Sequence, residues 1–133
     1  NMPRYEDVQD FLTKFKIKQN ELPSFADTEM LDKRFNHMQE ELMEFMYSKN
    51  CDDLHGMVDA LIDIVYVAYG TAAILGLSSD QWQRCFDEVH RANMSKVKDF
   101  NDKSHKVGVK KPKGWKAPCF QQILNPTKYS GGI

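Results

Sequence analysis

The sequence lacks the features that mark secreted and membrane-spanning proteins. Its three cysteines, Cys51, Cys85 and Cys119, are widely spaced and form no CxxC pair, which favours a reducing, cytoplasmic compartment. The N-terminal residues show no basic stretch followed by an apolar one, so secretion is not indicated. The longest apolar run, 64–77, is shorter than the roughly 20 residues that a membrane-spanning helix needs, and we expect a buried core helix there.

The sequence also lacks an excess of charge of one sign. Its 18 basic and 19 acidic side chains leave a formal net charge of −1, which gives no general reason to expect a nucleic acid or an anionic membrane as partner. No glycine-rich phosphate loop and no alternation of strand and helix patterns occurs. Hydrophobic residues make up 41% of the 133 residues and charged residues 28%, which is typical of one folded domain.

Apolar residues recur at helical spacing in four segments. The spacing predicts a first helix through Val8 and Phe15 and longer helices over about 27–48, 53–75 and 79–100. The third is apolar on nearly every side, so we expect it to be the central helix. The residues that we expect the fourth helix to bury are Trp82, Cys85, Phe86, Val89 and Val97. The sequence therefore predicts an all-α protein, a four-helix bundle.

The composition changes near residue 101. Six lysines lie between Lys103 and Lys116, among prolines and glycines and without a long periodic run. We expect a basic C-terminal arm over 104–133, with a short hairpin and a helical turn at about 120–124, after an all-α domain over 1–103. Such an arm is either a solvated tail or a lid over an anionic substrate.

Carboxylates border the apolar faces of the second and third predicted helices. Glu40, Glu41 and Glu44 form an EExxE motif, and Asp59 and Asp63 share one side of the next helix. A buried charged carboxylate is costly unless it is paired or binds a metal. Because few basic residues accompany these five, we interpret them as a site for a hard cation such as Mg²⁺ or Mn²⁺. The alternative is an acidic surface in water.

Two polar residues interrupt the apolar side of the fourth predicted helix. Asn93 and Lys96 project on the same side as Trp82 and Val89. An amide and an ammonium group beside a carboxylate and metal cluster suit a phosphorylated substrate. Alternatively, Lys96 extends into solvent and Asn93 caps the helix end.

These residues together give the chain a family resemblance. It resembles the all-α nucleoside triphosphate pyrophosphohydrolases, the MazG-like superfamily, which includes dimeric dUTPases, dCTPases and phosphoribosyl-ATP pyrophosphohydrolase. The resemblance covers about 28–120, and its motifs are EExxE at 40–44, Asp63 with Tyr66, DEVHRANMSKV at 87–97 and GWKAP at 114–118. The last two segments look like those of small phage and bacterial MazG-like proteins. The chain departs from the family's ExxD motif at Ala60, and Asp59 stands beside it.

The resemblance implies an activity and a set of site residues. It implies Mg²⁺-dependent hydrolysis of the α–β phosphate bond of a (d)NTP, with Mn²⁺ able to substitute, to give (d)NMP and pyrophosphate. The implied metal ligands are Glu41, Glu44 and Asp63, with Asp59 and Glu40 as further ligands or as the base. The implied catalytic residues are Glu40, Glu41 and Lys96, and the implied substrate-binding residues are Asn93, Lys96, Tyr66, His37, Arg34 and Trp115.

Partners and alternatives follow from the same resemblance. Family members assemble through their central helices, so we expect a homo-oligomer, a dimer or a tetramer, in the cytoplasm, or in the host cytoplasm if the protein is phage-encoded. One alternative is a phosphoribosyl-ATP pyrophosphohydrolase, and another is a non-catalytic metal-binding bundle. A di-iron bundle would need ExxH pairs, whereas this chain has only the DxxH pairs Asp52/His55 and Asp87/His90. The preferred base is left open, with Phe11, Phe15 and Phe120 as further candidates for its pocket.

Overall fold

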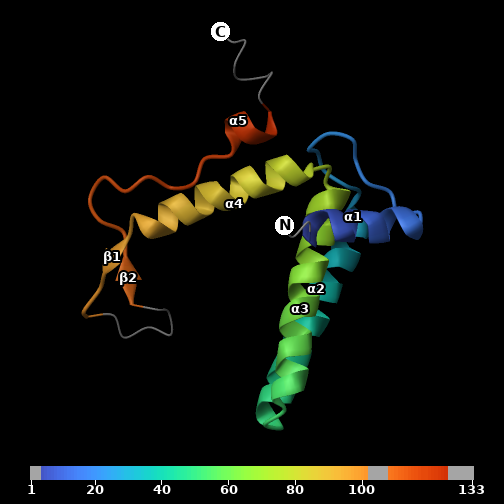
Figure 1. The fold of residues 1–133 in the computed structure, drawn as a ribbon, viewed down its shortest axis with the longest axis horizontal. Coiled ribbons are helices and arrows are strands. Elements are labelled where there is room, and N and C mark those ends of the chain that lie inside the picture. Colours follow the sequence, from blue (N-terminus) through green and yellow to red (C-terminus); the bar gives the residue numbers. More distant parts are fainter. Residues whose placement is uncertain (1–3, 102–107, 126–133) are drawn as a thin grey trace. The chain divides into compact units, whose positions relative to one another are not determined.

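Helices dominate the protein (Figure 1). A computed structural model of the chain describes residues 4–101 and 108–125. In chain order, its elements are α1 (Arg4–Lys14), α2 (Thr28–Asn50), α3 (Leu54–Ile74), α4 (Ser79–Met94), β1 (Val97–Lys98), β2 (Val109–Lys110) and α5 (Gln121–Leu124). The predicted all-α class is confirmed.

The chain forms two compact units, Asn1–Ser79 and Asp80–Ile133. The first unit contains α1, α2 and α3, and the second contains α4, the two short strands and α5. The domain boundary expected from composition, between residues 103 and 104, lies outside the described residues, and that division stays a prediction.

The first unit is built on two long antiparallel helices, α2 and α3, which lie side by side (Figure 1). Aspartate caps begin both helices, because Asp27 Oδ1 accepts a hydrogen bond from the Met30 amide at 2.8 Å and Asp53 Oδ1 accepts one from the Gly56 amide at 3.0 Å. The turn between them includes Asp52, whose φ of 54° suits an aspartate better than a branched side chain. The break that the predicted helices over 27–48 and 53–75 leave between them is therefore confirmed, although α2 continues to Asn50.

The core of the first unit lies where α1 crosses the C-terminal part of α3. Val8 and Leu12 of α1 are buried there, as are Val67 and Ile74 of α3. Tyr5 is also buried, and its hydroxyl donates to the Leu77 carbonyl at 2.8 Å. The apolar stripe predicted for the first helix thus fixes one end of the α2–α3 pair.

The rest of α3 is covered less than its apolar sequence suggested. Val58, Leu61, Ile62 and Val65 are each 46–60% exposed in the single chain. By length and composition, α3 is the one helix among the described residues that would suffice to cross a membrane. Of its apolar 18-residue stretch, 33% is buried. Core helices of soluble proteins meet the same criterion, so this is weak evidence for a membrane span.

In the second unit, α4 ends earlier than predicted. The expected helix over 79–100 stops at Met94, and the Ser95 hydroxyl donates to the Ala92 carbonyl at 2.7 Å. Val97 then pairs with Lys110 in an antiparallel hairpin. The prediction failed there because Val97 is β-branched and pairs with a strand that lies further along the chain. The spacing of apolar residues does not indicate such a pairing.

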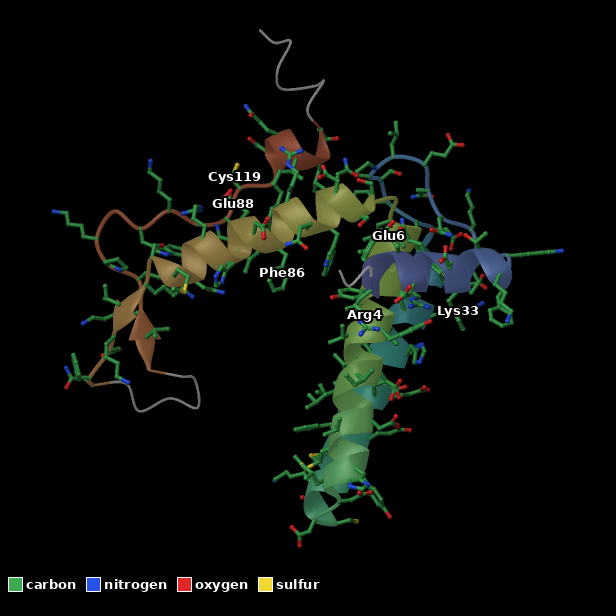
Figure 2. All side chains as sticks on the ribbon, viewed as in Figure 1. Arg4, Glu6, Lys33, Phe86, Glu88 and Cys119 are labelled. Atoms are coloured by element: carbon green, nitrogen blue, oxygen red, sulfur yellow. The ribbon has the colours of Figure 1, made fainter. Side chains whose placement is uncertain are left out.

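The predicted buried face of α4 was also largely wrong. Trp82 and Cys85 are half-buried, whereas Phe86, Val89 and Val97 are exposed. Phe86 points away from the C-terminal segment that carries Cys119 (Figure 2). Among the described residues of this unit, the hairpin, a loop and the short α5 are the segments available to cover the helix. The helical turn predicted near 120–124 is confirmed as α5.

Candidate metal centre

Three carboxylates meet between α2 and α3. Glu41 and Glu44 lie one turn apart on α2, and Asp63 faces them from α3. One oxygen from each of the three side chains lies within 4.8 Å of the other two. The α2–α3 pairing thus brings together the three residues that the resemblance implies as principal ligands, and their role as ligands stays a prediction.

Glu41 is partly buried, as is Asp63, whereas Glu44 is exposed. Only 13% of the Glu41 side chain is exposed, and its Oε1 atom is buried without a hydrogen-bond partner. Burial raises the pKa of this carboxyl, and the neighbouring Asp63 and Glu44 raise it further. His37 Nε2 lies 3.4 Å from Glu41 Oε2 and acts on the pKa in the opposite direction.

This arrangement fits a hard divalent cation. A buried carboxylate oxygen without a partner is costly, as is the mutual repulsion of three acids. An ion held by the three oxygens would relieve both costs, and an all-oxygen donor set is the one that Mg²⁺ and Mn²⁺ prefer. The solvated acidic surface considered for EExxE does not describe Glu41, although Glu44 is exposed.

Asp59 and Glu40 lie outside this cluster. The neighbour of Asp59, Ala60, is 1% exposed, while Asp59 itself is exposed. Position 60 therefore faces the interior. Asp59 is one residue earlier, which is about 100° around the helix, so its side chain points outward. Glu40 is exposed and lines a shallow surface hollow on α2 with Asn36, Met43 and other residues. That either residue is a ligand or a base stays a prediction.

Arg34 links the two helices that form the site. Its Nε donates to Thr71 Oγ1 and its Nη2 donates to the Val67 carbonyl, both at 3.1 Å. Burial lowers the pKa of the guanidinium. A Cβ added to Gly70 would lie 2.7 Å from Arg34 Nη2, so the glycine leaves room for this contact. The family resemblance implied for Arg34 only a role in substrate binding. Gly70, a glycine inside an apolar helix, was the sequence feature that could have indicated a close packing contact there.

The other predicted substrate residues are spread over both units. Tyr66 is on α3, and its ring packs edge-on against the ring of Phe11, with 5.6 Å between the ring centroids. Tyr66 also lines a hollow of about 510 Å³ together with residues of α1. Asn93, Lys96 and Trp115 belong to the second unit. Their contact with a substrate at the carboxylate cluster therefore stays a prediction.

Comparison with known proteins connects this site to one family. A family model described as phosphoribosyl-ATP pyrophosphohydrolase matches residues 8–93, more than half of the chain. The matched range contains most of α1, all of α2 and α3 and nearly all of α4, and so all three carboxylates of the cluster. No curated protein matches the chain.

The raised pKa of Glu41 gives a testable dependence of stability on pH. Because the pKa in the folded protein lies above the usual value of 4.5, protonation favours the metal-free folded state. This contribution is fully present below about pH 4.5 and is lost as the pH rises through the folded pKa. In EDTA at about pH 7, Glu41→Gln should therefore unfold at higher urea concentration than the wild type, and the gap should close toward about pH 4.5.

Glu29→Gln is the matched control, since Glu29 is an exposed residue of α2 that pairs with Lys33 at 3.2 Å. It should change the urea midpoint little at either pH. A Glu41→Gln protein less stable than the wild type in EDTA at neutral pH would show that this carboxylate has a stabilising partner without metal.

Proposed function

The chain belongs to the phosphoribosyl-ATP pyrophosphohydrolase family, and we propose that it hydrolyses the bond between the α- and β-phosphates of a (d)NTP, releasing (d)NMP and pyrophosphate. Membership in the family directly supports a pyrophosphohydrolase activity, because the family acts on phosphoric anhydrides. The observation that carries the proposal is the cluster of Glu41, Glu44 and Asp63 with a buried, unpartnered Glu41 oxygen.

Glu41, Glu44 and Asp63 are the proposed ligands of Mg²⁺, with Mn²⁺ able to take its place. A divalent ion bound there supplies positive charge that polarises the phosphoryl oxygens and offsets the charge of the leaving pyrophosphate. The chain prepares the site by holding α2 against α3 through Arg34, and His37 orients the Glu41 carboxylate. Such preorganisation avoids the cost of gathering three acids during the reaction.

The remaining predicted residues take roles around this centre. Glu40 and Asp59 are proposed as bases for the attacking water or as additional ligands, since Glu40 directly precedes Glu41 and Asp59 lies about one helical turn before Asp63, and both are exposed. Asn93 and Lys96 are proposed to bind phosphate oxygens through their amide and ammonium groups. Tyr66 is proposed to contact the sugar or a phosphate.

Phosphoribosyl-ATP is the second candidate substrate, and the matched family model itself favours it. Cleavage at the same α–β bond would again release pyrophosphate, so the metal site does not discriminate between the two. The groups attached to the nucleoside do, because phosphoribosyl-ATP carries an additional phosphorylated sugar on its base.

We also propose that copies of the chain associate through the α2–α3 pair in the cytoplasm, where the nucleotide pool is found. The support is an apolar surface that the single chain leaves exposed. Its residues are Phe35, Leu42, Met43, Met46, Val58, Leu61, Ile62 and Val65. This much exposed apolar area on one pair of helices is uncommon on proteins that remain monomeric, and closed symmetric oligomers are the usual way to cover it.

Product analysis tests the proposed reaction. The protein should be incubated with each common NTP and dNTP and with phosphoribosyl-ATP, plus Mg²⁺ or Mn²⁺. We expect a nucleoside monophosphate and pyrophosphate, and loss of the reaction in EDTA. Glu44→Gln and Asp63→Asn should lower the rate by roughly a hundredfold or more while staying folded, because each removes a proposed ligand. Asp32→Asn, an exposed position on the same helix, should retain the activity.

Two results would contradict this reaction. Diphosphate and orthophosphate as products would place cleavage at another bond. Full activity of either ligand variant would mean that the carboxylate cluster is not the metal centre. Turnover of phosphoribosyl-ATP alone would select the second candidate substrate.

Sedimentation equilibrium tests the proposed association. The wild type should have a mass of a dimer or tetramer at roughly micromolar concentration, and Leu61→Glu should shift it to monomer because a charge in an apolar interface is strongly disfavoured. Asp32→Asn again serves as the control. A wild-type monomer at roughly a hundred micromolar would contradict the proposal.

A further inference from the structure

The net charge of −1 conceals two units of opposite charge. Asn1–Ser79 carries seven basic and 14 acidic side chains, a formal charge of −7, whereas Asp80–Ile133 carries 11 basic and five acidic ones, a formal charge of +6. The proposed metal centre lies in the acidic unit, although its substrate would be strongly anionic. The excess of positive charge that would attract such an anion lies in the second unit.

The basic residues of α2 are poorly placed to bind a phosphorylated substrate. Lys33 pairs with Glu29 at 3.2 Å, and Arg34 donates two hydrogen bonds to α3. Lys49 lies in the last turn of the helix, beyond the glutamates. The basic side chains of α2 are therefore either engaged in other contacts or distant along the helix from the glutamates.

A tight turn fixes Trp115 on α4 in the second unit. The Trp115 amide donates to the Pro112 carbonyl at 3.0 Å, and Gly114 has the positive φ of 79° that such a turn favours in glycine. The indole Nε1 then donates to the Ala92 carbonyl at 2.8 Å. Arg91 Nη2 holds the following residues by donating to the carbonyls of Lys116 and Ala117, each at 3.3 Å. Trp115 is thus anchored through both its backbone amide and its indole ring.

Two lysines extend over this anchored ring. Lys111 Nζ lies 4.9 Å from the ring centroid and Lys96 Nζ lies 5.5 Å from it. The two ammonium groups are therefore within about 10 Å of each other. Over the described ranges, neither forms an ion pair with a carboxylate. An aromatic face attracts an ammonium group without neutralising its charge, so both remain available to an anion.

We propose that Lys96, Lys111 and Trp115, here called the Trp115 clamp, form a site within the second unit that binds the polyphosphate of a nucleotide, a proposal that rests on the proposed function. Lys111 is a phosphate-binding residue beside Lys96. Trp115 is a positioning residue that holds the two ammonium groups, and it does not serve as the platform for the base. A base stacked on the ring would have to displace an ammonium group from it.

Inorganic tripolyphosphate is the direct probe, because it presents the phosphates without base or sugar. Titration of the full chain in EDTA should show that Lys111→Ala weakens tripolyphosphate binding roughly tenfold, as expected for loss of a charged hydrogen bond. Lys113→Ala is the matched control, since Lys113 is an exposed lysine on the same turn, and it should stay within about twofold of the wild type. Lys111→Arg should restore most of the affinity.

Steady-state kinetics test the same residues with substrate. Lys111→Ala should raise KM roughly tenfold with kcat within about threefold of the wild type. Trp115→Leu should raise KM in the same way. The double variant with Lys111→Ala should raise KM by less than the product of the two separate increases, because the ring acts through the lysines. Trp115→Phe, which keeps an aromatic face, serves if Trp115→Leu fails to fold, and should raise KM less than Lys111→Ala does.

The outcomes separate this inference from the proposed reaction. Equal tripolyphosphate affinities of the Lys111→Ala and Lys113→Ala proteins would overturn the clamp, even if nucleotides are hydrolysed as proposed. A wild type that hydrolyses no nucleotide, but loses tripolyphosphate binding on Lys111→Ala, would retain the clamp as a phosphate site and overturn the reaction. Binding of a single-stranded oligonucleotide in place of tripolyphosphate would overturn the clamp in favour of a nucleic-acid surface.

Discussion

The antiparallel pairing of α2 with α3 is the constraint on which the candidate site depends. It places Glu41 and Glu44 against Asp63, an arrangement that is unfavourable without a cation because like charges in a partly buried place repel. Packing of α1 on α3 and the two hydrogen bonds of Arg34 to α3 hold the pair together despite that repulsion. The fold thus concentrates electrostatic repulsion at one point, as functional sites often do.

Much of the first unit could be predicted from the sequence. Helical periodicity predicted α1, α2 and α3, and it also placed Glu41, Glu44 and Asp63 beside an apolar face. Asp59 shows the limit of this reasoning. Two aspartates four residues apart share a side of a helix within about 40°, yet a rotation of that size decides whether a carboxylate enters the space between two helices or remains in water.

The features that sequence reasoning missed depend on contacts between distant residues. The end of α4 at Met94 is set by a hairpin that pairs Val97 with Lys110. The packing role of Arg34 requires Thr71 and Val67. The total charge of −1 averaged an acidic and a basic unit, so the balance that gave no reason to expect an anionic partner was true of the whole chain and not of its parts.

Binding of Mn²⁺, followed by electron paramagnetic resonance and competed with Mg²⁺, tests the central claim most directly, because it reports on the metal centre independently of substrate. The wild type should bind Mn²⁺, Mg²⁺ should displace it, and Asp63→Asn should weaken binding by roughly tenfold or more, as loss of a ligand does. Asp32→Asn should bind Mn²⁺ as the wild type does. Equal affinities of the Asp63→Asn protein and the wild type would contradict a metal centre formed by Glu41, Glu44 and Asp63.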